Sequence, residues 1–393
     1  MSRQLIDRSP DLRKLVEEGY ELDVRGAYLV IQHVPYVDAD KKVRLGELVM
    51  QLTLAGEQTT RPSDHVAYFA GSEPCDSAGR RLSKIINGEQ HNEPAPGVKW
   101  EYMFSAHPQA GEWSEYPDYY AKVTTYVAML SSHAQRIDES VTARTYEVVK
   151  ETDSDSPFLY TDTATPRAGL DAINSRLRGD RMAIVGLGGT GSYILDFVAK
   201  TLVAEIHVFD GDRYLQHNAF RGPGATPIEE LTGGPNKAEH WAAVYGRMRR
   251  GVVPHPYRID AETADELAGM DFVFVALDDG PSRALVVSAL EQAGVAFIDV
   301  GMGLYAEEAI GGQMRTSISE PAHPCNRAKI PVGATDPNNV YKHNVQIVEA
   351  NALHAALAVI RWKKFRGLHV DLGHEGFSIY ALETNTIISE DVW

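Results

Sequence analysis

Glycines and aspartates between residues 186 and 212 form the most chemically suggestive pattern in this chain of 393 residues. A short apolar run, 182–185, breaks into a turn that contains Gly186, Gly188, Gly189 and Gly191. An apolar helix-like segment follows, and a second strand-like run ends in Asp210 and Asp212. Such glycines let backbone N–H groups approach a phosphate at a helix N-terminus. We therefore expect a strand–turn–helix–strand unit that binds a nucleotide.

The glycine turn alone does not decide which nucleotide binds. Asp210 follows Gly191 by 19 residues, at the tip of the second strand-like run. A carboxylate at this place accepts hydrogen bonds from a ribose. A nicotinamide-dependent dehydrogenase and an ATP-dependent enzyme both fit this pattern.

Polar residues further along the chain favour ATP. Asn218 is followed by two cations, Arg221 and Lys237, which suit a triphosphate better than a hydride-transfer site. Asp278 ends another strand-like run and is expected in the same crevice. A carboxylate beside a triphosphate is repulsive unless magnesium lies between them, when it becomes a metal ligand. The set predicts an adenylate-forming site.

These residues resemble the ThiF/MoeB/HesA superfamily, which includes the ubiquitin-activating enzymes. The chain has the family turn as GLGGTGS (186–192) and the aspartate pair as Asp210-Gly211-Asp212. Asn218 and Arg221 follow the first aspartate by eight and eleven residues, as in the family. Lys237 matches the family lysine, the pair Asp278 and Arg283 matches the magnesium aspartate with its arginine, and 344–364 resembles the late helix. The resemblance covers roughly residues 165–365.

The resemblance implies that a C-terminal carboxylate, usually that of a ubiquitin-like protein, attacks the α-phosphate of ATP. The products are an acyl-adenylate and pyrophosphate. By this resemblance Asp210 holds the ribose and the glycine turn holds the phosphates. Asn218 orients the phosphates, Arg221 and Lys237 stabilise their charge, and Asp278 binds magnesium. Adenylation of a peptide or small-molecule carboxylate, in cofactor, tRNA-modification or natural-product chemistry, remains the alternative.

The resemblance also implies a homodimer in which an arginine from before the glycine turn reaches the partner's site. By position, Arg167 and Arg176 are the candidates. Both also fit the simpler interpretation of surface charges on a helix.

Cysteine usage departs from that of many members of this superfamily. The chain has two cysteines, Cys75 and Cys325, so it lacks the two CxxC pairs that bind structural zinc. Cys325 lies in EPAHPCNRAKIP, where His323, Arg327 and Lys329 are expected to lower its pKa and favour a thiolate. It is our candidate for a thioester with the activated tail. If it is inert, the enzyme stops at the adenylate or passes it to a separate acceptor.

The pattern of apolar segments predicts two domains. Residues 1–150 indicate a small α+β accessory domain, with strands within 22–37, 43–53 and 65–69 and a helix over 118–137. Between them, 71–97 are expected to form loops around one short amphipathic piece, 80–86. Residues 151–165 are polar and acidic and suggest a linker. Residues 166–393 alternate strands and helices, which is typical of an α/β, doubly wound, mostly parallel Rossmann-like sheet. The accessory domain is expected to recruit the ubiquitin-like protein, a conjugating enzyme or a target.

Composition limits the classes of partner. The formal net charge of −16 argues against nucleic acid as a ligand. The first 20 residues are charged throughout, and no apolar run approaches about 18 residues. We expect a cytoplasmic protein with no membrane-spanning segment.

Overall fold

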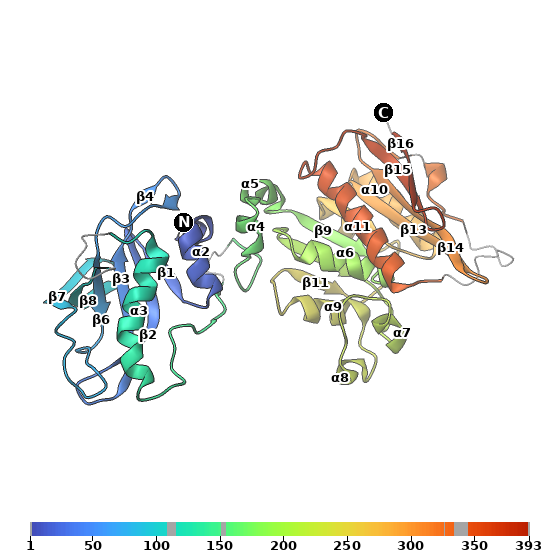
Figure 1. Cartoon of the computed structure of the whole chain (residues 1–393). Helices are drawn as coiled ribbons and strands as arrows, with labels where there is room; N and C mark the ends of the chain where they lie inside the picture. Colours follow the sequence, from blue (N-terminus) through green and yellow to red (C-terminus); the bar gives the residue numbers. More distant parts are fainter. Residues whose placement is uncertain (1, 108–114, 151–154, 326, 334–344, 392–393) are drawn as a thin grey trace. The chain divides into compact units, whose positions relative to one another are not determined.

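The computed structural model describes residues 2–107, 115–150, 155–325, 327–333 and 345–391. These residues form two compact units, shown in Figure 1. The first comprises Met1–Val149 and Asp162–Gly169, and the second comprises Lys150–Thr161 and Leu170–Trp393. Within the described ranges, no helix combines the length and the apolarity that a membrane crossing requires.

The first unit is built on a six-stranded antiparallel sheet in the order β1-β2-β3-β6-β8-β7. Its strands are β1 (Leu22–Arg25), β2 (Tyr28–Val37), β3 (Val43–Gln51), β6 (Val66–Ala70), β7 (Ile86–Ala95) and β8 (Val98–Ser105), and a separate hairpin pairs β4 (Leu54–Ala55) with β5 (Gln58–Thr59). The helices that accompany them before residue 150 are α1 (Ser2–Arg8), α2 (Pro10–Glu17) and α3 (Tyr119–Gln135). The predicted α+β character of this region is therefore confirmed.

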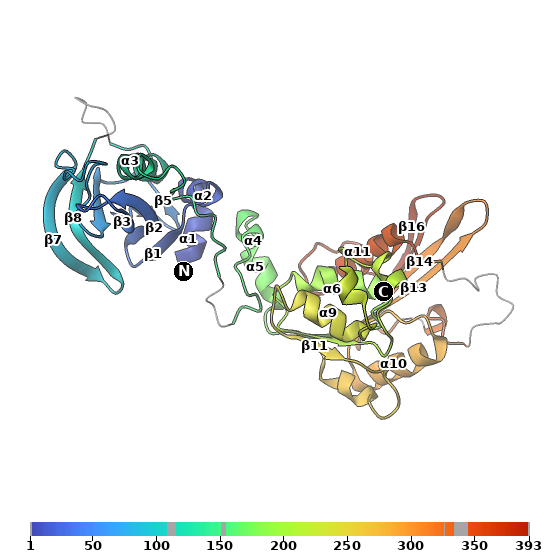
Figure 2. The same ribbon diagram turned by 90° about the horizontal axis from the view of Figure 1, so that it is seen from below.

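The helix α3 lies along one face of this sheet (Figure 2). The side chain of Asp118 caps its first turn by accepting a hydrogen bond from the N–H of Ala121 at 2.8 Å. Its buried face contributes Val123, Tyr126 and Leu130 to the main core of the unit. Since buried residues on the helix recur at three- and four-residue spacing, the helical periodicity of this segment predicted the element correctly.

The prediction of loops over 71–97 is wrong, because β7 occupies Ile86–Ala95 and pairs with β8. The sequence INGEQHNEPA lacks alternating apolar residues. It lies at the edge of the sheet, most of its side chains are exposed, and its register shifts at three places. An edge strand that buries neither face leaves no hydrophobic pattern in the sequence.

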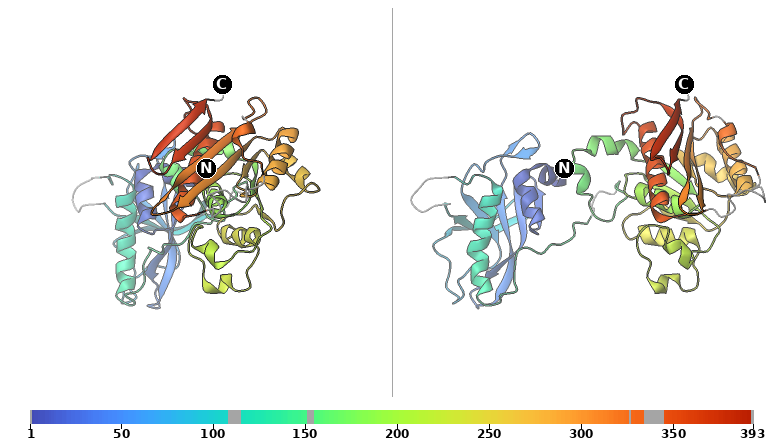
Figure 3. Two further views of the ribbon diagram at one scale, coloured as in Figure 1. Left: turned by 90° about the vertical axis from the view of Figure 1, so that its right-hand side faces the viewer. Right: turned by 45° about the vertical axis from the view of Figure 1, so that its right-hand side comes forward.

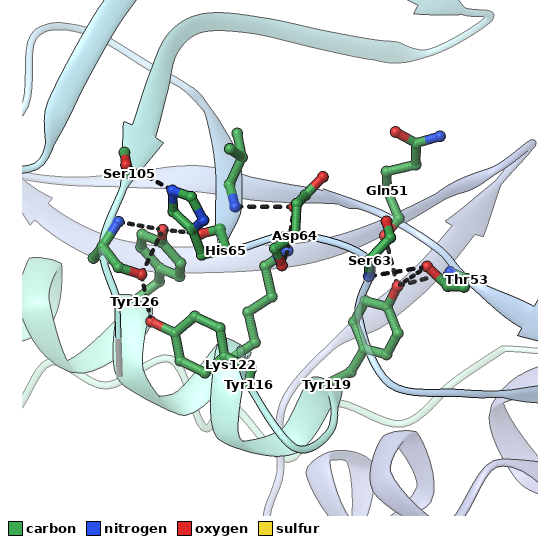
Figure 4. Close-up of polar contacts among 12 residues, drawn as sticks. Gln51, Thr53, Ser63, Asp64, His65, Ser105, Tyr116, Tyr119, Lys122 and Tyr126 are labelled. Carbon is green, nitrogen blue, oxygen red and sulfur yellow. Dashed lines mark hydrogen bonds and ion pairs between the residues drawn. The ribbon is translucent and has the colours of Figure 1, made fainter. Parts of the chain in front are cut away.

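A network of tyrosine hydroxyls ties α3 to the surrounding loops (Figure 4). The hydroxyl of Tyr126 donates to the carbonyl of His65 and accepts from the N–H of Ala106 at 2.9 Å. Lys122 is buried, and its ammonium donates to the carbonyl and to the carboxylate of Asp64, each at 3.0 Å. Burial lowers the pKa of Lys122, and Asp64 opposes that shift. These contacts therefore hold the segments around residues 64 and 106 against α3.

The segment predicted as a linker over 151–165 is divided between the units. Residues 155–161 pack within the second unit, where the N–H of Leu159 donates to the carbonyl of Met248 at 2.9 Å. The helix α4 (Ala164–Arg167) belongs to the first unit. Residues 151–154 lie outside the described ranges.

The second unit holds an eight-stranded sheet in the order β11-β10-β9-β12-β13-β14-β15-β16. Its strands are β9 (Arg181–Val185), β10 (Glu205–Phe209), β11 (Val252–His255), β12 (Phe272–Val275), β13 (Phe297–Ala306), β14 (Ile310–Ser319), β15 (Glu375–Ala381) and β16 (Thr386–Asp391). The first five in the spatial order are parallel, and the last three continue the sheet in antiparallel pairs. Figure 3 shows β14 to β16, in orange to red, as this extension. The predicted α/β, mostly parallel sheet is confirmed.

Helices cover both faces of the parallel part (Figure 2). On one face α6 (Gly189–Ala199), α9 (Lys237–Tyr245) and α11 (Val348–Phe365) pack against Met182 and Ile184 of β9. On the other, the 3₁₀ helix η2 (Ala264–Gly269) and α10 (Gly280–Ala293) pack against Ala183 and Val185. The central strand is thus buried on both faces, as a continuous apolar run predicts.

Short helical elements complete the second unit. They are α5 (Asp171–Asn174), η1 (Ser175–Leu177), α7 (Gln216–Ala219), α8 (Ile228–Leu231) and η3 (Arg327–Lys329). Sequence reasoning missed the edge strand β11, which has four residues including a proline. The helix α9 begins directly after its N-cap Asn236, which follows a pair of glycines and a proline.

Replacing Tyr126 by Phe tests the anchoring role of the tyrosine network. The variant leaves the N–H of Ala106 and the carbonyl of His65 without their shared partner. We expect the first unit to lose about 1–3 kcal/mol of unfolding free energy. Hydrogen exchange of peptides from α3 and β8 across a denaturant series measures this loss.

Tyr120→Phe is the matched control, because its hydroxyl contacts Glu18 at the surface and we expect a change of at most about 0.5 kcal/mol. Equal losses in the two variants would contradict the anchoring role.

Candidate functional site

A crevice of about 1100 Å³ opens at the carboxyl ends of the parallel strands, where ligands of doubly wound sheets bind. It continues along the β13–β14 hairpin. Most of the residues predicted from the sequence line it, namely Gly186, Gly188, Gly189, Asp210, Asp212, Asn218, Arg221, Lys237, Asp278 and Arg283. Gly191 and Cys325 are not among its lining residues. The fold therefore brings together predicted residues that are up to 97 positions apart in the sequence, Gly186 and Arg283.

The four glycines of the turn serve different purposes. Gly186 has a φ of +95°, and a Cβ there would lie 2.5 Å from the carbonyl oxygen of Ala276. A Cβ on Gly189 would lie 2.0 Å from the amide nitrogen of Asn351, and one on Gly191 would lie 1.9 Å from the carbonyl oxygen of Gly186. A Cβ on Gly188 would meet no atom within 4 Å. Packing thus requires three of the glycines, whereas Gly188 leaves open space in the crevice.

The carboxylate of Asp210 connects the glycine turn to the second strand. Its Oδ2 accepts a hydrogen bond from the N–H of Leu187 at 2.7 Å, and its Oδ1 accepts one from the N–H of Asp212 at 2.8 Å. Only 8% of its side chain is exposed. Burial raises the pKa of Asp210, and the ammonium of Lys237 and the two backbone N–H groups oppose that shift. Asp210 therefore positions the turn itself, which sequence reasoning did not anticipate.

Lys237 begins α9 and points back toward the two aspartates. Its ammonium lies 3.0 Å from Oδ2 of Asp212 and 3.7 Å from Oδ2 of Asp210. Asn236 caps the helix by accepting from the N–H of Ala238 at 2.7 Å, and its amide donates to the carbonyl of Asp210 at 2.8 Å. Asp212 has a lowered pKa because the side chains of Arg258 and Lys237 donate hydrogen bonds to it. Asp212 therefore binds two cationic side chains in the crevice wall, those of Lys237 and Arg258.

Arg221 carries a buried nitrogen without a partner. Its Nε makes no hydrogen bond among the described residues, and burial lowers the pKa of the guanidinium while the charge of Asp278 opposes that shift. Asp278 is exposed. The carbonyl of Arg221 accepts from the amide of Asn351 at 3.2 Å, so α11 fixes the backbone of this arginine. An unpaired guanidinium N–H at this place is suited to an anion.

Asn218 has a structural contact in addition to its place in the crevice. It is buried, and its Oδ1 accepts from the N–H of Leu215 at 2.8 Å, which closes the start of α7. Its role toward a ligand remains a prediction.

A buried charged triad lies in the wall of the crevice, which both of its arginines line. Asp299 is fully buried and lies between two arginines: Arg283, whose Nε is 3.1 Å away, and Arg315, which donates to its other oxygen. Arg283 also donates to the carbonyls of Leu277 and Pro331. A Cβ on Gly301 would lie 2.6 Å from Arg315 Nη2, so that strand residue must be small. Sequence reasoning missed Asp299 and Arg315, although a charge inside the apolar run FIDVGMG was a usable signal.

The expectation that the pKa of Cys325 is lowered is wrong. Burial is the largest effect on its pKa and raises it, as do the charges of Glu291 and Asp299. A hydrogen bond with Ser319 and the charge of Arg327 oppose this rise but do not outweigh it. Arg327 also pairs with Glu291 at 2.6 Å, and Lys329 pairs with Glu390. The thiol packs at the margin of the apolar core that includes α10. The sequence places these cations near Cys325 but does not reveal their partners.

The two candidate arginines before the glycine turn both have partners within this chain. Arg167 forms an ion pair with Glu17 at 3.1 Å. Arg176 donates to the carbonyl of Gly367. Either arginine would have to lose these contacts in order to reach the site of a partner subunit. That role remains a prediction.

Comparison with known proteins gives the family. A model described as the ThiF family matches residues 162–361. The chain belongs to the ThiF family. The resemblance inferred from the glycine turn and the downstream residues is thereby confirmed. A second model, described as a domain of unknown function (DUF6791), matches residues 10–163, ahead of the ThiF region.

Individual relatives of this ThiF-family chain are distant. The SAMP-activating enzyme E1 of Haloferax volcanii is 30% identical over 168 residues, which are 42% of this chain and 58% of that enzyme. A crystal structure of E. coli MccB with ATP is 18% identical with a TM-score of 0.45, over 56% of this chain and 66% of that chain. PaaA is 16% identical with a TM-score of 0.43, over 56% and 76%. The chain thus covers less than two thirds of the length of the SAMP-activating enzyme and of MccB.

Two alanine substitutions in the glycine turn test the division of roles. Gly188→Ala adds a methyl group to open space, so we expect the melting temperature to stay within about 2 °C and the affinity for Mg²⁺·α,β-methylene-ATP to fall at least about tenfold. In Gly189→Ala the added methyl group collides with the side chain of Asn351, so we expect the free energy of unfolding to fall by about 1–3 kcal/mol. Calorimetry measures both quantities. Loss of stability in Gly188→Ala, or unchanged nucleotide affinity in it, would contradict this assignment.

Proposed function

We propose that the ThiF-family unit uses ATP and magnesium to adenylate the C-terminal carboxylate of a ubiquitin-like protein and releases pyrophosphate. The observation that carries the proposal is the buried, unpartnered Nε of Arg221 beside the glycine turn, in the same crevice as Lys237 and Asp278. An orphaned guanidinium N–H is costly unless an anion binds it. A phosphate of ATP satisfies it.

The glycine turn supports binding of the phosphates. It leads into α6, a helix of 11 residues that begins at the crevice. The first N–H groups of a helix have no partner within it, so those of α6 are available to an anion in the crevice. The missing side chain at Gly188 leaves the room that a phosphate needs. Asp210 retains lone pairs on both oxygens beyond its two backbone contacts, and these are available to ribose hydroxyls.

The charged side chains support transfer to the α-phosphate. Arg221 and Lys237 offset the negative charge that builds on the phosphates as pyrophosphate leaves. Asp278 is the exposed carboxylate that would hold magnesium, which when bound neutralises charge between that carboxylate and the phosphates. An oxygen of the substrate carboxylate attacks the α-phosphorus, the bond to the bridging oxygen breaks, and a mixed anhydride forms.

The extension of the crevice along β13 and β14 supports an extended substrate tail. Gly301 and Gly303 line it, and a Cβ on Gly303 would meet no atom within 4 Å. The Haloferax volcanii relative is by name a SAMP-activating enzyme E1, which favours an activating-enzyme role over other ATP chemistry. In this proposal the N-terminal unit recruits the ubiquitin-like protein, a conjugating enzyme or a target, and the enzyme acts as a homodimer.

The raised pKa of Cys325 and its position outside the lining of the crevice favour a reaction that ends at the adenylate. A thioester on Cys325 is accordingly the less favoured continuation.

Exchange of labelled pyrophosphate into ATP tests adenylation. With proteins or peptides that end in Gly-Gly, we expect exchange by the wild type and a loss of at least about 100-fold in Asp278→Ala, which corresponds to about 2.7 kcal/mol. Asp265→Ala is the matched control, because Asp265 is exposed and does not line the crevice. Absence of exchange with every such tail would remove the proposal for ubiquitin-like substrates. Exchange with small carboxylates alone would favour the alternative substrate class.

Replacement of Cys325 by alanine tests the end point of the reaction. We expect pyrophosphate exchange to stay within about twofold of the wild type, because the thiol does not line the crevice. We also expect no thiol-sensitive adduct of the tail with the wild-type enzyme. Mass spectrometry of the enzyme after incubation with ATP and the tail peptide measures this. A reducible adduct that disappears in Cys325→Ala would show that the thioester step exists.

A further inference from the structure

Arg258 is a crevice residue to which the sequence patterns assign no role. It follows β11 by three residues and lines the same crevice as Asp210 and Asp278. Its side chain is 75% exposed. An arginine this exposed is usually only a solvated surface charge, so its contacts decide whether it has a role.

The aliphatic part of Arg258 lies across the middle residue of the aspartate pair. A Cβ added to Gly211 would lie 2.8 Å from Cγ of Arg258 and 3.1 Å from its backbone nitrogen. Any other residue at position 211 would therefore displace the arginine. The turn between Asp210 and Asp212 is shaped to hold this side chain against the wall of the crevice.

The guanidinium of Arg258 is held by a single exchangeable contact. Its Nη2 donates to Oδ1 of Asp212 at 2.7 Å, and this is its one hydrogen bond among the residues that the structure describes. A guanidinium has five N–H donors and a flat face, so most of its binding capacity is unused. Exposed ion pairs of this kind contribute about 0–1 kcal/mol, and a ligand can displace one readily.

The strand order places Arg258 at the nucleobase end of the crevice. The phosphate turn follows β9, the ribose carboxylate Asp210 follows β10, and Arg258 follows β11, the next strand outward. Four apolar side chains that line the crevice belong to one core cluster, and Ile259 follows Arg258 directly: Phe209, Ile259, Leu277 and Val286. A flat apolar ring fits this wall, whereas a phosphate does not.

We propose that Arg258 covers the adenine ring of bound ATP, with its guanidinium plane stacked on the base opposite the apolar wall. The arginine turns from Asp212 onto the base when the nucleotide enters. Asp212 then keeps Lys237, 3.0 Å away, as its remaining cation. This inference rests on the proposed use of ATP and adds a residue that contacts the base.

Calorimetric titration with three probes tests the contact. The probes are Mg²⁺·α,β-methylene-ATP, AMP and inorganic tripolyphosphate, which has no base. In Arg258→Ala we expect both nucleotides to bind about tenfold more weakly, which corresponds to about 1.4 kcal/mol, and tripolyphosphate to be unaffected. Arg258→Lys keeps the charge but not the plane and should recover little of the loss. Gly211→Ala should reproduce the loss with the arginine present, because its methyl group displaces the stem.

The control is Arg247→Ala, which removes another exposed arginine paired with a carboxylate, Glu230, at 2.7 Å outside the crevice. We expect it to leave all three affinities unchanged. Unchanged nucleotide affinity in Arg258→Ala would overturn the inference. A loss shared by tripolyphosphate would also overturn it and would assign the arginine to the phosphates. Failure of the wild type to bind the ATP analogue would instead overturn the proposed function, and this inference with it.

Discussion

The buried carboxylate of Asp210 is the constraint on which the rest of the site depends. Removing a carboxylate from water is unfavourable unless hydrogen bonds and a cation replace the lost solvation. Here two backbone N–H groups and the ammonium of Lys237 do so. One N–H belongs to the glycine turn and the other to the aspartate pair, while the lysine begins α9. A single side chain therefore fixes three segments relative to one another at the ends of β9 and β10.

The balance of charges makes the crevice suited to an anionic ligand. Asp212 restrains two cations, Lys237 and Arg258, at its own oxygens, whereas Arg221 keeps an unpartnered nitrogen. In the same crevice wall Asp299 binds two arginines in a buried triad that keeps one net positive charge. Fixed cations in a partly dry site stabilise developing negative charge without reorganisation. The arrangement suits phosphoryl chemistry better than hydride transfer.

The sequence predicted the elements that follow simple physical patterns. Apolar runs such as 182–185 gave the buried parallel strands, and the spacing of Asn218 and Arg221 after Asp210 gave the family. Prediction failed where neighbours distant in sequence decide the outcome. The polar edge strand β7 has no apolar pattern, and the pKa of Cys325 depends on burial and on cations that bind other carboxylates. Asp299 acquires Arg315 through the β13–β14 pairing and Arg283 from α10.

A crystal structure of the chain with Mg²⁺·α,β-methylene-ATP tests the central claim most directly. We expect the phosphates at the N-terminus of α6, a phosphate oxygen within about 3 Å of Nε of Arg221, and ribose hydroxyls on the carboxylate of Asp210. Phosphates placed away from α6, or Nε of Arg221 still without a partner in the complex, would contradict it.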